Sequence, residues 1–281
     1  MPIIRTDDPA DPRLADYRGV SDADLAARQG IFIAEGRLVV RRLLASSTFT
    51  TRSVLVTEAA FASLADTLAR RPGVPVLLVR QGVMNAIAGF DIHRGCLAIG
   101  ERPEPAPWRE IVEQPPTPSF QLPRVIVVLE RVANADNVGG VFRSASAFGA
   151  GAVLLDPSTV DPLYRKAIRT SMGAALQVPF ARAEPWPGTV TELRQLGFAV
   201  VAMTPSAGAQ PLRETVATVA GRPVAIVLGH EGDGLTAGAL AACELQARIP
   251  MSGEVDSLNV ATAAAIALYE FSGSASSLDT Q

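Results

Sequence analysis

Two kinds of apolar pattern alternate along this chain. Near-continuous apolar runs of strand length occur at 125–130, 152–156, 198–204 and 224–229. Such runs are typical of parallel β-strands that are covered on both faces. Segments whose apolar residues recur every three or four positions lie between and after them, at 137–149, 162–170, 189–196, 236–243 and, rich in alanine, 257–271. They predict helices, and the alternation predicts an α/β domain with a parallel sheet over residues 124–272.

A smaller α/β domain is predicted over residues 1–100 by the same patterns. Strands are expected at 53–57, 74–79 and 95–100, and helices at 35–46 and 58–71. Seven of the chain's 21 prolines fall between residues 101 and 123. Proline favours extended chain, so this segment is interpreted as a linker with one helical turn at 108–112. The polar tail at 273–281 is expected to be disordered.

Composition describes a protein with a large core and a small net charge. Hydrophobic residues make up 48% of the 281 residues, charged residues 19%, and the net charge is −3. That balance argues against a general polyanion binder. The charge is uneven, however: residues 1–102 carry a net +2 and residues 103–281 a net −5. Of the 25 basic residues 24 are arginine, which we attribute to a compositional bias.

Several classes of protein are not expected. Two cysteines, Cys96 and Cys243, are too few for a disulfide framework, and both lie in apolar contexts typical of buried thiols. With only His93 and His230 beside them, no metal site is expected. The N-terminal segment lacks the pattern of a signal peptide. No uninterrupted stretch of about 18 apolar residues occurs. We therefore expect a cytoplasmic protein with no membrane partner.

Polar residues that could carry chemistry follow three of the predicted strands, where ligands bind in open α/β sheets. In the first loop Asn137 opens a helix, Gly139 and Gly140 lie in its first turn, and Arg143 follows. Glycines there weaken a helix, which indicates close approach of the backbone to a ligand. The alternative is a plain helix cap at Asn137 and a solvated Arg143.

The other two loops carry glycines and amides. Gly229, Gly232 and Gly234 permit a tight turn around Glu231, whereas His230 is interpreted as a structural loop residue. At the third loop Ser257 is the expected N-cap of the alanine-rich helix. Asn259 is a poor helix former, so it belongs either to a capping network or to a site.

In this order the three segments resemble the SpoU (TrmH-type) family of RNA ribose methyltransferases, within the SPOUT superfamily. The family's N-x-G-x-x-x-R motif corresponds to 137–143, G-x-E-G-x-G-L to 229–235, and I-P-M…S-L-N-V to 249–260. The resemblance covers about 124–271, including a small-residue stretch at 169–180. The N-terminal part resembles the substrate-binding domain of many members. Two positions depart from the pattern: Ala135 replaces the usual proline and Gly140 the usual alanine. Both departures concern rate or substrate geometry more than reaction type.

The resemblance implies a C-terminal SPOUT domain, with a parallel sheet and a trefoil knot, preceded by a small α/β substrate-binding domain. It also implies a homodimer through the C-terminal domain, with the active site at the interface. S-adenosylmethionine would be held largely by backbone groups. The implied cofactor-binding residues are Leu228, Gly229, Gly232, Ile249, Met251, Leu258 and Asn259.

The implied reaction is methylation of a ribose 2′-hydroxyl of RNA. The family's chemistry centres on Arg143, oriented together with the ribose by Asn137, Glu231, Ser257 and Asn259. Arginine stays protonated in proteins, so we expect it to position phosphate and hydroxyl rather than act as the base. The appended N-terminal domain favours ribosomal RNA, with transfer RNA as the alternative. RNA contacts are expected from two basic clusters, which are otherwise solvated surface: Arg37, Arg41 and Arg42 on one helical face, and Arg165, Lys166 and Arg169.

Two other classes compete with this interpretation. One is a non-catalytic RNA-binding or ribosome-assembly protein on the same fold. Ala135 favours this class, but the presence of the motif residues argues against it; these are Asn137, Arg143, Glu231 and Asn259. The other is a Rossmann-type nucleotide enzyme, for which the chain lacks the glycine fingerprint and the acidic residue that follows it.

Overall fold

The computed structural model describes residues 2–18, 21–88, 95–113, 125–252 and 256–276. The chain forms two compact units: Met1–Glu104 with Pro162–Gln177, and Pro105–Asp161 with Val178–Gln281. The first unit therefore includes a segment that the sequence pattern places in the C-terminal domain. Side chains from the N-terminal part hold this segment. The Asp22 carboxylate accepts from N and Nε of Arg165 over 3.0 and 2.8 Å, and Arg42 donates to the Met172 carbonyl over 2.9 Å.

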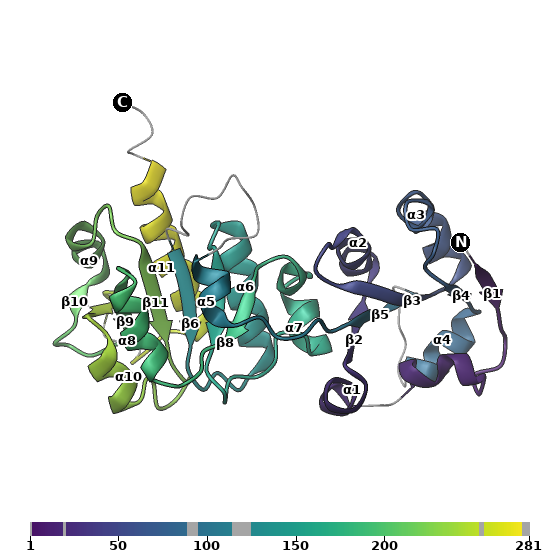
Figure 1. Cartoon of the computed structure of the whole chain (residues 1–281), viewed down its shortest axis with the longest axis horizontal. Coiled ribbons are helices and arrows are strands. Elements are labelled where there is room, and N and C mark those ends of the chain that lie inside the picture. Colours follow the sequence, from purple (N-terminus) through teal and green to yellow (C-terminus); the bar gives the residue numbers. More distant parts are fainter. Residues whose placement is uncertain (1, 19–20, 89–94, 114–124, 253–255, 277–281) are drawn as a thin grey trace. The chain divides into compact units, whose positions relative to one another are not determined.

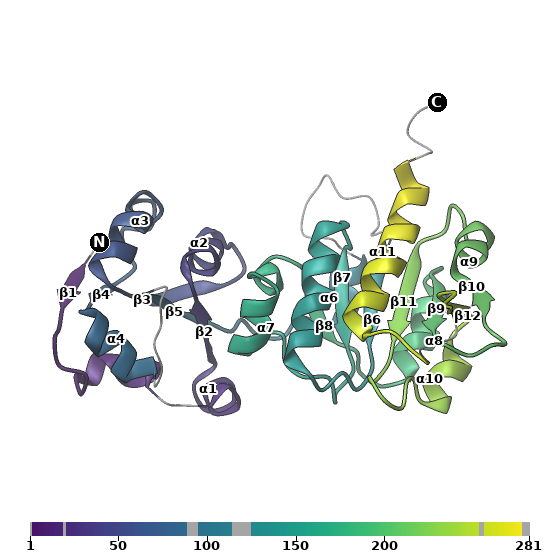
Figure 2. The ribbon, with the colours of Figure 1, turned by 180° about the vertical axis from the view of Figure 1, so that it is seen from behind.

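The second unit contains a seven-stranded parallel sheet with the order β10-β12-β9-β11-β6-β7-β8 (Figures 1 and 2). Its strands are β6 (Val125–Leu129), β7 (Ala152–Leu155), β8 (Phe180–Arg182), β9 (Ala199–Met203), β10 (Gln210–Pro211), β11 (Val224–Leu228) and β12 (Leu245–Arg248). The four apolar runs of the sequence become β9, β11, β6 and β7, which are neighbours at the middle of the sheet. The predicted parallel α/β fold is confirmed.

Helices cover both faces of this sheet (Figure 2). They are α5 (Trp108–Glu113), α6 (Ala135–Ala147), α8 (Gly188–Gln195), α9 (Leu212–Thr218), α10 (Ala237–Ala242) and α11 (Val260–Ser276). Alternate residues of β6 face opposite ways. Ile126 and Val128 pack with side chains of α5 and α8, whereas α6 and α11 pack together on the other face, where α11 contacts β6 and β11.

Two predictions about flexible segments are wrong within the described residues. The helical turn expected at 108–112 is present as α5, but Trp108 and Val112 are buried in the core of the second unit. That part of the expected linker is therefore packed rather than extended. Helix α11 continues to Ser276, four residues into the tail expected to be disordered. Residues 114–123 of the linker and 277–281 of the tail lie outside the described residues.

The first unit is built on a five-stranded mixed sheet of order β1-β4-β3-β5-β2. Its strands are β1 (Ile3–Arg5), β2 (Ile31–Glu35), β3 (Thr50–Val56), β4 (Val76–Leu78) and β5 (Cys96–Glu101), and its helices are η1 (Pro12–Tyr17), α1 (Asp22–Gln29), α2 (Arg37–Ala45), α3 (Glu58–Ala69), α4 (Gln81–Ala88), α7 (Arg165–Thr170) and η2 (Ala174–Leu176). The pattern predicted β3, β4, β5, α2 and α3. It missed α1, which is mostly polar, although its Ser21 cap accepting from the Asp24 amide over 3.1 Å is a recognisable start signal.

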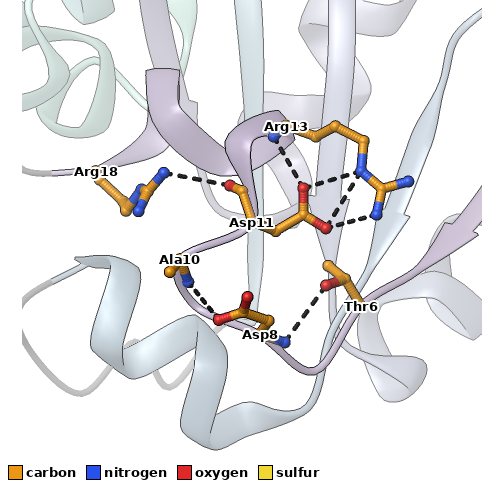
Figure 3. Close-up of polar contacts among 6 residues, drawn as sticks. All are labelled: Thr6, Asp8, Ala10, Asp11, Arg13 and Arg18. Carbon is orange, nitrogen blue, oxygen red and sulfur yellow. Dashed lines mark hydrogen bonds and ion pairs between the residues drawn. The ribbon is translucent and has the colours of Figure 1, made fainter.

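A network of hydrogen bonds around the Asp11 carboxylate lies at the start of η1 (Figure 3). Asp11 caps the helix by accepting from the Arg13 amide over 2.9 Å, and the Arg13 guanidinium also donates to the carboxylate. Arg18 donates to the Asp11 carbonyl over 3.2 Å. The hydrogen bonds from Arg13 hold the pKa of Asp11 well below its usual range. This local network fixes the start of η1, and two residues of that helix, Leu14 and Tyr17, are buried.

Candidate functional site

A pocket opens in the second unit at the carboxyl ends of three neighbouring strands, β12, β9 and β11. It is lined by Met203, Thr204, Pro205, Leu228, Gly229, His230, Glu231, Gly232, Gly234, Ile249, Met251, Ser257, Leu258, Val260 and Ala263. The wall combines branched apolar side chains with the main chain of a glycine-rich loop. Such a lining suits a small molecule that has an apolar ring and a few polar edges.

The loop 229–235 is a tight turn that only glycine permits at its first position. A Cβ on Gly229 would lie 2.4 Å from the carbonyl carbon of Gly234. Gly234 has a left-handed φ of 69° and donates to the His230 carbonyl over 3.0 Å. The His230 ring accepts at Nδ1 from the amides of Gly232 and Asp233, over 3.0 and 3.1 Å. His230 therefore shapes the loop, and it also lines the pocket.

Three side chains from distant motifs form a polar relay beside the pocket. Asn259 donates from Nδ2 to Oδ1 of Asn137 over 2.8 Å, and Asn137 donates from Nδ2 to Oε1 of Glu231 over 2.6 Å. Asn137 is only 8% exposed, so its amide is held by these two partners. The relay joins α6, the glycine loop and the start of α11, and it orients the Glu231 carboxylate at the pocket wall.

The structure corrects two assignments of helix caps. Asn134 caps α6 by accepting from the Asp136 amide over 2.9 Å, so Asn137 lies inside the first turn. Asn259, not Ser257, caps α11: its Oδ1 accepts from the amides of Ala261 and Thr262, over 2.9 and 3.3 Å. Ser257 lies outside the helix and lines the pocket. Asn259 thus belongs to both the capping network and the site, because its Oδ1 accepts from the helix amides while its Nδ2 donates to Asn137.

Gly140 serves helix packing rather than the ligand approach expected from the sequence. A Cβ at this position would come within 2.7 Å of the Ala261 Cβ. Glycine therefore lets α6 approach α11 closely enough for Asn137 and Asn259 to meet. Ala135, the other departure from the family pattern, is the first residue of α6, and nothing in the structure explains its choice.

Arg143 lies on the exposed surface of α6, six residues after Asn137. Among the described residues, its guanidinium has no hydrogen bond or ion pair with another side chain, and it does not line the pocket. The structure therefore brings Asn137, Glu231, Ser257 and Asn259 together but leaves Arg143 apart from them in a single chain. An exposed guanidinium is suited to binding an anion.

The six basic residues predicted to contact RNA all lie in the first unit. Helices α2 and α7 both pack against β2, which brings the two clusters into one unit, contrary to the expected division between domains. Several members have internal partners: Arg165 binds Asp22, Arg169 lies 3.8 Å from Glu35, Arg42 donates to Met172, and Arg41 donates to the Ser63 carbonyl. Arg37 is exposed in the first turn of α2.

Seven of the pocket-lining residues were not assigned as site residues from the sequence: Met203, Thr204, Pro205, His230, Gly234, Val260 and Ala263. Met203 is the last residue of β9, one of the predicted strands, and Thr204 and Pro205 follow it. The rule that ligands bind at carboxyl ends of parallel strands would have included them. Their neutral, ordinary side chains carried no further signal. Among the described residues, no group of His, Cys, Asp and Glu is arranged to hold a metal ion, and no helix is long and apolar enough to span a membrane.

Comparison with known proteins agrees with this fold. The SpoU rRNA Methylase family matches residues 124–269. An uncharacterized tRNA/rRNA methyltransferase of Mycobacterium bovis is 42% identical over 268 residues, covering 94% of this chain and 89% of the relative. A 23S rRNA (guanosine-2′-O-)-methyltransferase, RlmB of Nitrosomonas europaea, is 31% identical over 209 residues, covering 74% of this chain and 75% of that protein.

A solved structure is also similar over nearly the full length. The AdoMet-bound rRNA methyltransferase from Sinorhizobium meliloti has a TM-score of 0.78 and 28% identity, with 96% of this chain and 97% of that chain covered. The family match spans the parallel sheet, the relay and the pocket described above. The chain belongs to the SpoU rRNA methylase family.

Proposed function

We propose that this protein transfers the methyl group of S-adenosylmethionine to a ribose 2′-hydroxyl of RNA. The observation that carries the proposal is the relay from Asn259 through Asn137 to Glu231 at the wall of a pocket made of main chain and apolar groups. The AdoMet-bound relative supports the cofactor, and the name of the RlmB relative supports the 2′-hydroxyl as acceptor.

The pocket fits S-adenosylmethionine by its chemistry. Leu228, Ile249 and Leu258 offer apolar contacts to a ring, and the glycine loop offers main-chain groups to polar edges. When bound, the cofactor supplies a sulfonium methyl group that an oxygen nucleophile can attack. The residues of the pocket bind and orient it, which converts the encounter of two substrates into a positioned reaction.

The remaining residues act on the RNA. In the reaction the methyl–sulfur bond breaks as the methyl–oxygen bond forms, and the hydroxyl loses its proton. The exposed Arg143 guanidinium can bind a phosphate beside the target ribose and stabilise charge that develops on the 2′-oxygen. Arginine stays protonated in proteins, so the proton passes to another acceptor. Glu231, Ser257 and the two asparagines orient the ribose.

The proposal extends to assembly and substrate. We expect a homodimer through the C-terminal domain, in which a partner subunit brings Arg143 to the pocket, and a trefoil knot formed by the Gly232 loop and residues 249–260. Tyr269 of α11 is 65% exposed next to Phe148, and an exposed aromatic side chain at this position supports a subunit interface there.

The first unit would select the RNA, with ribosomal RNA favoured over transfer RNA. We expect the protein to act in the cytoplasm.

The experiment is a methyl-transfer assay on RNA from cells that lack the protein, with methyl-labelled S-adenosylmethionine. The expected product is a nucleotide whose 3′ phosphodiester resists alkaline hydrolysis, because the 2′-oxygen can no longer attack it. Label on a base, with alkali-sensitive linkages, would refute the acceptor. Cofactor binding without transfer to total RNA would support the non-catalytic alternative instead.

A further inference from the structure

A buried carboxylate outside the family motifs holds both ends of the pocket loop. Glu130 follows β6 directly and is 1% exposed. Its Oε2 accepts from the Thr236 amide over 2.7 Å, and its Oε1 accepts from the Thr236 hydroxyl and the Trp186 indole, each over 2.7 Å. Its own amide donates to the Leu228 carbonyl over 2.9 Å.

These partners bracket the loop 229–235. Leu228 is the last residue of β11 before the loop, and Thr236 is the first residue after it. Thr236 also caps α10 by accepting from the Ala239 amide over 3.2 Å. One residue at the end of the neighbouring strand β6 therefore fixes where the loop begins and where it ends. Between those points lie five pocket-lining residues: Gly229, His230, Glu231, Gly232 and Gly234.

The chemistry of these contacts requires a carboxylate. Both oxygens of Glu130 act as acceptors, and all three donors are N–H or O–H groups. A glutamine would place an N–H group against one of these donors. A buried carboxylate is costly unless its oxygens accept hydrogen bonds, and here donors satisfy both oxygens. The described contacts of the carboxylate anchor the loop and the Trp186 segment that packs against the core of the second unit.

We infer that Glu130 is a positioning residue for cofactor binding, acting through the loop 229–235 without lining the pocket itself. The inference rests on the proposed function in one respect, that the pocket holds S-adenosylmethionine. By setting the loop ends, Glu130 places the main-chain groups of the pocket and the Glu231 carboxylate that Asn137 holds.

A neighbouring pair of residues provides a matched control. Asp156 follows β7 and is 2% exposed; it accepts from the amide and the hydroxyl of Thr159, each over 2.7 Å, and from the Arg131 amide over 2.9 Å. It is also a buried carboxylate that binds a threonine at a strand end. Its described hydrogen bonds reach the loop only indirectly, through Arg131, whose guanidinium pairs with Asp233 over 3.1 Å in an exposed ion pair of the kind that contributes little. Variants Glu130→Gln and Thr236→Val are therefore compared with Asp156→Asn and Thr159→Val.

The test measures the Kd for S-adenosylmethionine by calorimetry, the melting temperature, and amide hydrogen exchange at Gly232 and Gly234 on the full-length protein. Glu130→Gln is expected to raise Kd about tenfold, the size typical of a buried donor left unpaired, and to speed exchange at both amides. Thr236→Val is expected to do the same to a smaller extent, while Thr236→Ser stays near wild type. The Asp156 and Thr159 variants are expected to lower the melting temperature and leave Kd and loop exchange unchanged.

Two results would overturn the inference: Glu130→Gln with wild-type Kd and wild-type loop exchange, or Asp156→Asn changing both as much as Glu130→Gln does. If Glu130→Gln does not fold, the comparison of Thr236→Val with Thr159→Val decides in the same way. Wild-type protein that fails to bind S-adenosylmethionine would refute the cofactor assignment instead. Loop exchange would then still decide whether Glu130 positions the loop.

Discussion

The side-chain amide of Asn137 donates to the Glu231 carboxylate over 2.6 Å, although 94 residues separate them in the chain. Asn137 is held from its other end by Asn259. Both oxygen and nitrogen of its amide are therefore committed, which fixes its orientation. These two hydrogen bonds join the three sequence motifs into one connected group.

Two substitutions of Asn259 separate its role as the cap of α11 from its hydrogen bond to Asn137. Asn259→Asp keeps an oxygen for the amides of Ala261 and Thr262 but cannot donate to Asn137, so we expect a melting temperature near wild type with weaker cofactor binding and slower methyl transfer. Asn259→Ala loses the cap as well, with about 1 kcal/mol of stability. Calorimetry with S-adenosylmethionine and thermal unfolding check both variants. Wild-type binding and rate in Asn259→Asp would contradict a pocket role.

Arg143→Ala is expected to keep cofactor affinity and stability and to lose methyl transfer. The side chain is exposed and does not line the pocket, so its removal leaves no buried group unpaired. A loss of about 100-fold or more in kcat is typical when a charge-stabilising donor is removed. The same transfer assay, with labelled cofactor and cellular RNA, measures it. Turnover at the wild-type rate would rule out the assigned role.

Reversing Arg37 and Arg41 to Glu is expected to weaken RNA binding by the intact protein and to flatten its dependence on salt. Both lie on α2, and Arg37 is exposed. Binding of labelled RNA across a range of salt concentrations gives the slope. The double variant Arg194→Glu with Arg213→Glu, in the second unit, changes the charge by the same amount and serves as the control. An unchanged affinity and slope in the double variant would show that α2 does not contact RNA.

Gly140→Ala tests the close packing of α6 on α11. The added Cβ would lie 2.7 Å from the Ala261 Cβ, and such overpacking typically costs about 1–3 kcal/mol. Alanine gains about 1 kcal/mol of helix propensity, so the net loss is expected to be small. The stronger expectation concerns coupling: Gly140→Ala with Ala261→Gly should be more stable than the sum of the single changes. Denaturant unfolding of all four proteins measures the coupling, and additive effects would disprove the contact.

The two free thiols are expected to resist alkylation in the native protein. Burial raises the pKa of Cys96 to about 12 and that of Cys243 to about 12. The thiolate is the reactive form, so at pH 8 both groups remain almost fully protonated, and reactivity rises only as the pH approaches 12. Iodoacetamide labelling, followed by mass spectrometry, should modify both cysteines quickly in denaturant and slowly without it. Cys96 is buried and Cys243 is half-buried, and fast native labelling of either at pH 8 would contradict its raised pKa.

The local sequence determined much of the second unit. Four apolar runs are long enough and continuous enough to require cover on both faces, so they identify the central strands β9, β11, β6 and β7. Glycine at 229 and 234, where the backbone turns tightly, identified the pocket loop. Short elements such as β10 and the polar α1 carry too few apolar residues for any periodicity to be read.

Tertiary structure decided which residues meet. The sequence does not encode, in any local pattern, that Asn137 lies between Asn259 and Glu231, that Gly140 faces Ala261, or that residues 162–177 pack with the first unit. Each of these depends on the order of strands in the sheet and on how helices pack across it. For the same reason Glu130 carried no signal in the chain, because its importance comes only from Thr236, 106 residues away, reaching its carboxylate.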